Sequence, residues 1–103
     1  MKKIEYNESD IVSILKDINE FVVSLDQMDS VYHEFGTQAW KDEMIDYLVT
    51  KKVFDRLANV RATLSMPFPT DLGDDDMDFL EREMEDVNYW TYKSYLEKTK
   101  AKK

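Results

Sequence analysis

Apolar residues recur at helical spacing along most of the chain, and the first series runs from Ile11 to Phe35. Its members follow one another at intervals of three and four residues, which is the pattern of an amphipathic helix that packs at a shallow angle against another helix. Ser9 precedes the series as a candidate N-cap, and Gly36 follows it as a residue typical of a helix end. This pattern predicts one long helix over residues 10–35.

A second helical region is expected over residues 38–64, with Thr37 as its candidate cap. On one straight helix, the apolar residues before position 50 and those after position 52 project in directions about 160° apart. A straight helix cannot turn both sets toward the same partner, and Thr50 is a candidate cap for a new helix. The sequence therefore predicts either a single helix over 38–64 or a break near residues 50–52.

Turn-forming residues separate this region from a third predicted helix. Pro67 and Pro69 cannot continue a helix, and Gly73 adds to the turn chemistry that follows them. Beyond this connection, apolar residues at helical spacing predict a helix over residues 75–98. The basic tail, residues 99–103, is expected to fray.

The composition is typical of a folded, all-α protein. Hydrophobic residues make up 43% of the 103 residues, which is enough to build a core. The chain has only two glycines and two prolines, too few for the many short turns of an all-β fold. We therefore expect a single helical domain, residues 1–103, built as an antiparallel bundle of three long helices, or of four if the second helix is broken.

Negative charge is concentrated in residues 71–86, which we call the acidic segment. It holds nine acidic residues and one basic residue, Arg82, so its formal charge equals the −8 of the whole chain. A protein of this charge is repelled by nucleic-acid phosphates and by anionic lipids. We therefore expect neither direct nucleic-acid binding nor membrane binding, and we expect a basic surface of another protein as partner.

On a continuous third helix, four carboxylates of the acidic segment would form a row within an arc of about 60°. They would be spaced about 4.5–6 Å apart along the helix axis, and the four residues are Asp74, Asp78, Glu81 and Glu85. Such a row is similar to the phosphate track of a nucleic acid, so it could dock on the nucleic-acid-binding site of a partner protein. Small inhibitors of nucleic-acid machinery, including phage anti-defence proteins, often have this size and acidity, which is an analogy of composition. The alternative is that these acidic residues only favour the positive end of the helix dipole.

Exposed aromatic side chains are the second candidate for partner binding. On the predicted third helix, Phe79 and Trp90 project within about 20° of each other and outside the core stripe. Together with Tyr92 they could supply most of the binding energy at an interface. The alternative is that neighbouring helices bury them.

Enzymatic chemistry has little support in this sequence. The chain has no cysteine, one histidine and two glycines, so it offers neither a thiolate nucleophile nor a glycine-rich phosphate loop. Two groups of carboxylates at helical spacing keep a magnesium-dependent all-α nucleotide hydrolase as the weakest alternative, and they are Asp42, Glu43 and Asp46, and Glu83 with Asp86.

The sequence thus predicts a non-enzymatic acidic protein-binding module without a cofactor, acting as an inhibitor or regulator. No apolar run approaches the length of a membrane span, and no signal-peptide pattern begins the chain, so we expect it in the cytoplasm. The main alternative is a structural homo-oligomer, a homodimer for example, that pairs through the seam of the first helix and through Phe79 and Trp90.

Overall fold

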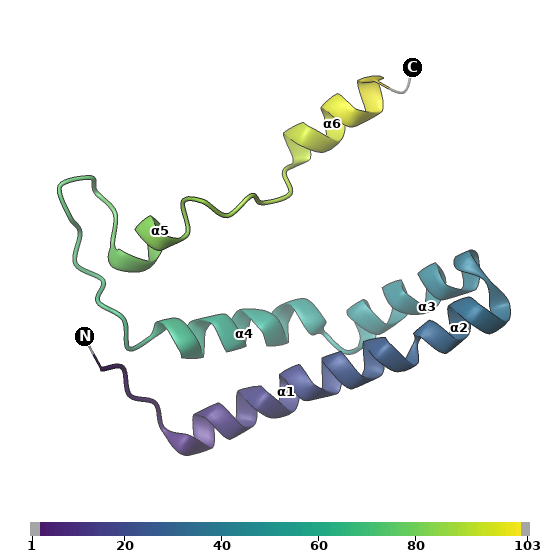
Figure 1. Ribbon diagram of the computed structural model, residues 1–103, viewed down its shortest axis with the longest axis horizontal. Coiled ribbons are helices and arrows are strands. Elements are labelled where there is room, and N and C mark those ends of the chain that lie inside the picture. The colour runs from purple at the N-terminus through teal and green to yellow at the C-terminus, as the bar shows by residue number, and fades with distance from the viewer. Residues whose placement is uncertain (1–2, 102–103) are drawn as a thin grey trace. The chain divides into compact units, whose positions relative to one another are not determined.

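The computed structural model describes residues 3–101, and within them every regular element is a helix. The helices are α1 (Glu8–Gln27), α2 (Asp29–Phe35), α3 (Thr37–Thr50), α4 (Val53–Ser65), α5 (Phe79–Glu83) and α6 (Tyr92–Ala101) (Figure 1). The predicted all-α fold is therefore confirmed. The chain divides after Phe68 into two compact units, which we call the helical hairpin and the C-terminal unit. That both belong to a single domain stays a prediction.

The helical hairpin has two antiparallel arms, one made of α1 and α2 and the other of α3 and α4. Helix α2 packs against α3, and α1 packs against α4 (Figure 1). The chain reverses at Gly36, whose φ of 91° lies in a region that glycine adopts without the strain of a side chain. This hairpin brings the beginning of α1 close to the end of α4.

The first arm largely matches the helix predicted over residues 10–35. It begins two residues early, because Asn7 rather than Ser9 is the N-cap: the Asn7 side chain accepts a hydrogen bond of 3.0 Å from the Ser9 amide. The arm is interrupted at Met28, which separates α1 from α2 but keeps right-handed helical angles.

The predicted break in the second arm is confirmed at Lys51 and Lys52. Lys52 adopts a left-handed conformation, φ 51° and ψ 46°, which ends the regular helical path. Thr50, however, does not cap α4, because its hydroxyl donates to the carbonyl of Asp46 within α3. The phase change between the two apolar sets therefore corresponds to a real change of helix.

The hydrophobic core of the hairpin is small and lies between its two arms. Phe21 of α1 clusters with Tyr47 of α3 and Val53 of α4, and the half-buried Leu25 and Met28 pack against this cluster. Two further buried residues, Ile14 and Val60, extend the α1 to α4 contact. The seam that the sequence predicted for the first helix thus faces the returning arm.

An arginine clamp joins α1 to α4 beside this core. The guanidinium of Arg56 donates to Asp17 at 2.7 Å and to Glu20 at 2.8 Å, from Nη2 and Nη1 respectively. Its Cζ also lies 4.6 Å from the centre of the Phe21 ring, in cation–π contact. The hydrogen bond from Arg56 lowers the pKa of Glu20, and both carboxylates raise the pKa of Arg56.

The C-terminal unit does not contain the continuous helix predicted over residues 75–98. Helix α5 spans five residues and ends at Glu83, and no regular element follows until α6 begins at Tyr92. Two caps explain the division: Asp78 starts α5, and the hydroxyl of Thr91 accepts a hydrogen bond of 3.1 Å from the Ser94 amide at the start of α6. Helix α6 includes residues 99–101 of the predicted tail, and residues 102–103 lie outside the described residues.

Replacing Phe21 by alanine should destabilise the hairpin by about 3 kcal/mol, because the ring is 5% exposed at the centre of a small core. Chemical denaturation followed by circular dichroism would measure this loss. The matched control is Phe54→Ala, since Phe54 is 79% exposed on α4 and should change stability by less than about 0.5 kcal/mol. Equal effects of the two substitutions would contradict the core described above.

Replacing Arg56 by glutamine should lower the melting temperature, because it removes the hydrogen bonds to Asp17 and Glu20 and the contact with Phe21. The control, Arg61→Gln, removes the same charge from an exposed position of α4 and should have little effect. The pKa of Glu20 lies below its ordinary 4.5, so its stabilising effect is complete above pH 4.5 and is lost as pH falls through the lowered pKa. The difference in melting temperature between the natural protein and Arg56→Gln should shrink accordingly in acid.

Candidate functional site

The acidic segment begins with a tight loop over residues 73–77. The Gly73 amide donates to the Met77 carbonyl at 2.9 Å, and the Asp76 amide donates to the Gly73 carbonyl at 3.1 Å. The Asp75 carboxylate accepts a hydrogen bond of 3.2 Å from the Met77 amide, and Asp76 has a left-handed φ of 59°. The residues that were expected to start the third helix therefore form a loop instead.

Arg82 closes this loop by binding Asp75 with two parallel hydrogen bonds. Nε donates to Oδ2 and Nη2 donates to Oδ1, both at 2.9 Å, and Nη2 also donates to the Met77 carbonyl at 3.1 Å. The guanidinium beside Asp75 holds the pKa of that carboxyl well below its usual range, and Asp75 in turn raises the pKa of Arg82. A Cβ at Gly73 would lie 2.7 Å from Nη2, so a larger residue at this position would require the Arg82 side chain to shift.

Two other carboxylates of the acidic segment form a capping box at the start of α5. The Asp78 side chain accepts a hydrogen bond of 2.8 Å from the Glu81 amide, and the Glu81 side chain accepts one of 3.4 Å from the Asp78 amide. Each carboxylate thus satisfies a backbone amide that the first turn of a helix leaves free. The alternative role considered for the acidic residues, helix initiation, applies to these two.

The predicted row of carboxylates does not form on one helix. Asp74 lies in the loop before α5, Asp78 is its N-cap, Glu81 lies within it, and Glu85 lies in the turn that follows. The prediction was wrong in its geometry because it assumed a continuous helix, so the regular spacing that would imitate a phosphate track is lost. The acidic segment nevertheless keeps its excess of negative charge, because the pair of Arg82 with Asp75 is the one ion pair within residues 69–101.

The predicted aromatic residues also lie on separate elements. Phe79 is the first residue of α5, Trp90 lies in the non-helical stretch before α6, and Tyr92 begins α6. Phe79 and Trp90 therefore do not share a helix face, contrary to the prediction. All three are exposed, at 42%, 75% and 67% respectively.

A cluster of three aromatic rings forms at the start of α6, and we call Trp90, Tyr92 and Tyr95 the aromatic cluster. The Tyr92 and Tyr95 rings stack with their centres 6.5 Å apart, and the Trp90 ring lies 6.3 Å from that of Tyr95. Tyr95 was not predicted in this role, because on a continuous third helix its spacing places it in the core stripe. The spacing of three residues between Tyr92 and Tyr95 could have indicated this pair, because residues three apart are neighbours on a helix surface.

The carboxylates that kept a hydrolase as an alternative do not form a metal centre among residues 3–101. No group of three or more potential ligands is placed so that it could hold a metal ion in this part of the chain. Asp42 instead accepts a hydrogen bond of 2.9 Å from Gln38, one turn earlier on α3. His33 is likewise in a local contact, 3.1 Å from Asp29.

Comparisons of this chain with protein-family models, with curated proteins and with solved structures give no match. None of the helices among the described residues has both the length and the apolar character needed to cross a membrane. Any function must therefore be inferred from the side chains themselves.

The pairing of Asp75 with Arg82 should make the loop sensitive to acid. Because the pKa of Asp75 is lowered from 3.8, the stabilising effect of its ionised form is complete above pH 3.8 and is lost as pH falls through the lowered pKa. Carboxyl-carbon NMR would follow Asp75 directly, and the Met77 amide should move in the same pH range. In Arg82→Gln the Asp75 pKa should rise toward 3.8, and an unchanged pKa would contradict the pairing.

Proposed function

We propose that this chain is a non-enzymatic protein-binding module, an inhibitor or regulator, whose acidic segment docks on a basic surface of another protein. The observation that supports it best is the imbalance of charge in the acidic segment: nine carboxylates are present, and the one guanidinium pairs with Asp75. Like charges held close together repel one another, so a positively charged partner would relieve this repulsion. Attraction of this kind accelerates association and weakens as salt is added.

The aromatic cluster supplies the apolar component that the carboxylates lack. Exposed tryptophan and tyrosine rings are the residues that most often dominate binding energy at protein interfaces. Trp90 and Tyr92 follow the acidic segment within a few residues, so one partner could contact both the charges and the rings. In this arrangement the carboxylates set orientation and the rings supply affinity.

The lack of a buried core among the described residues of the C-terminal unit also favours a binding role. None of its described side chains is buried, and most of its apolar residues are exposed. A segment with so little internal burial gains much of its stability from whatever it packs against. Binding would therefore order this unit as well as hold the partner.

A second candidate function, a structural homodimer, is favoured by the exposed apolar side chains of the hairpin. Leu15 and Val22 of α1 and Leu57 and Leu64 of α4 are exposed, and their helical phase places them on the side of the hairpin away from Arg56. Two such hairpins could bury these faces against each other as a four-helix bundle. Sedimentation equilibrium of the natural protein and of a Leu15→Ser, Leu57→Ser variant would test this alternative.

The acidic-segment proposal is tested by neutralising four of its carboxylates that make no hydrogen bond within the loop or the cap. The variant carries Asp74→Asn, Glu83→Gln, Glu85→Gln and Asp86→Asn, so it keeps the pairs that build the local structure. A tagged form of each protein would be used to capture partners from native lysate at low and at high salt. We expect the variant to retain about tenfold less of a basic partner at low salt than the natural protein.

The matched control changes four exposed carboxylates of the hairpin by the same charge, as Glu34→Gln, Glu43→Gln, Asp46→Asn and Asp55→Asn. It should capture the partner as the natural protein does. The partner would then be purified, and its direct affinity for all three proteins measured. Equal affinity of the three would exclude the acidic segment as the docking surface.

A further inference from the structure

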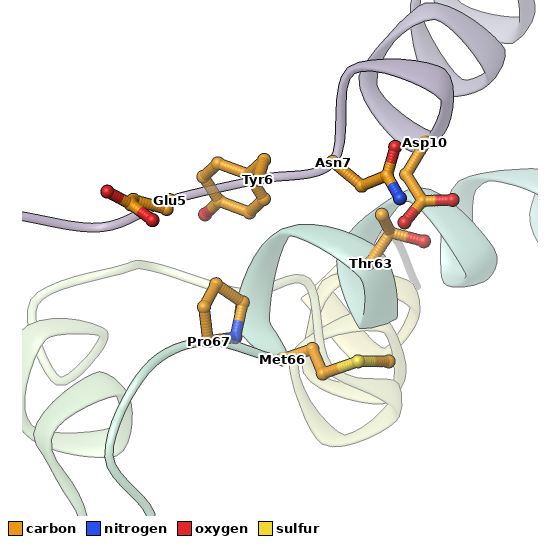
Figure 2. Close-up of a pocket in the computed structure, with 7 residues that line it drawn as sticks. All are labelled: Glu5, Tyr6, Asn7, Asp10, Thr63, Met66 and Pro67. Carbon is orange, nitrogen blue, oxygen red and sulfur yellow. The ribbon is translucent and has the colours of Figure 1, made fainter.

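The open end of the hairpin contains a pocket that no part of the proposed function uses. It has a volume of about 450 Å³, within the range of ligand sites, and it lies between the N-terminal segment with the start of α1 and the end of α4 (Figure 2). Its walls come entirely from the helical hairpin, and the lining residues are Glu5, Tyr6, Asn7, Asp10, Thr63, Met66 and Pro67.

Specific local contacts hold the two walls in place. The Tyr6 hydroxyl donates a hydrogen bond of 2.6 Å to the Leu64 carbonyl, which ties the N-terminal segment to the end of α4. Asn7 fixes the start of α1 as its N-cap. On the other side, the Phe68 amide donates to the Ser65 carbonyl at 3.1 Å in the turn that contains Pro67.

The chemistry of the walls favours a cation on an apolar stem. Glu5 and Asp10 contribute carboxylates, and no basic side chain among residues 3–101 lines the pocket. The end of α4 adds the negative end of one helix dipole and the start of α1 adds the positive end of another, so the two carboxylates decide the sign of the charge in the pocket. Figure 2 shows the Tyr6 ring on one side of the hollow and Met66 and Pro67 on the other, which offers aromatic, thioether and aliphatic surface.

We propose that this pocket binds the side chain of a lysine or arginine that another protein presents. The ammonium or guanidinium group would lie at Asp10, Glu5 would add negative charge from the other end of the pocket, and the methylene stem would pack on Tyr6 and Met66. The pocket has room for an extended side chain of this kind. The proposal concerns the hairpin alone and does not rest on the proposed function.

Blocked tripeptides with a central lysine or arginine are the probes for a binding experiment. A tripeptide with a central norleucine keeps the stem without the charge, and methylammonium keeps the charge without the stem. Binding to the full chain at low salt would be followed by NMR, with the Met66 methyl group as reporter and the Met44 methyl group on α3 as a reference outside the pocket. We expect the lysine and arginine peptides to shift Met66 but not Met44, and to bind about fivefold or more tightly than either partial probe.

Single substitutions then test the two carboxylates. Asp10→Asn should weaken the lysine peptide about two- to fivefold, and Glu5→Gln should weaken it less. Glu8→Gln is the matched control, because Glu8 lies in the same first turn of α1 as Asp10 but does not line the pocket. Glu8→Gln removes the same kind of favourable interaction with the helix dipole as Asp10→Asn does. It should leave the affinity for the lysine peptide unchanged.

Three results would overturn this proposal. An unmoved Met66 signal would show that the peptides bind elsewhere or not at all. Equal losses in Asp10→Asn and Glu8→Gln would show that only overall charge matters. Methylammonium binding as tightly as the lysine peptide would show that the apolar wall does not contribute. The variant with four neutralised residues in the acidic segment should bind the peptides as the natural protein does, which keeps this test separate from the one above.

Discussion

The helical hairpin depends on one side chain, Arg56, which makes ion pairs and packs against an apolar ring at the same time. Arg56 reaches from α4 to two carboxylates of α1 and at the same time covers the ring of Phe21. A two-armed structure with few buried side chains has little else to fix how its helices slide along each other. Because a bidentate guanidinium requires particular positions of its partners, this clamp specifies the register of α1 against α4. The core cluster of Phe21, Tyr47 and Val53 joins the same two arms beside this clamp.

Sequence patterns predicted the hairpin well because its determinants are periodic and local. The spacing of apolar residues placed the first arm, and the change in their phase placed the break that the structure shows at Lys51 and Lys52. The finer assignments were less accurate, because the candidate caps Ser9 and Thr50 do not cap the helices predicted for them. Asn7 caps α1, and the Thr50 hydroxyl donates to a carbonyl of its own helix. Residue type alone does not decide which of these hydrogen bonds forms.

The third predicted helix failed for a different physical reason. Apolar residues at helical spacing were present, but side chains seven residues apart, Asp75 and Arg82, close a loop that a helix would not allow. The caps at Asp78 and Thr91 then start short helices on either side of a non-helical stretch. Composition therefore predicted the charge of the candidate site and identified its exposed aromatic residues, whereas the arrangement of those groups required the structure.

The glycine at position 73 shows that charge content alone does not define how this protein arranges its carboxylates. A Cβ at this position would lie 2.7 Å from the guanidinium that binds Asp75, so a chain with an identical isoelectric point could hold these two side chains differently. The absence of one methyl group, as well as the number of carboxylates, therefore bears on how this loop holds its charges.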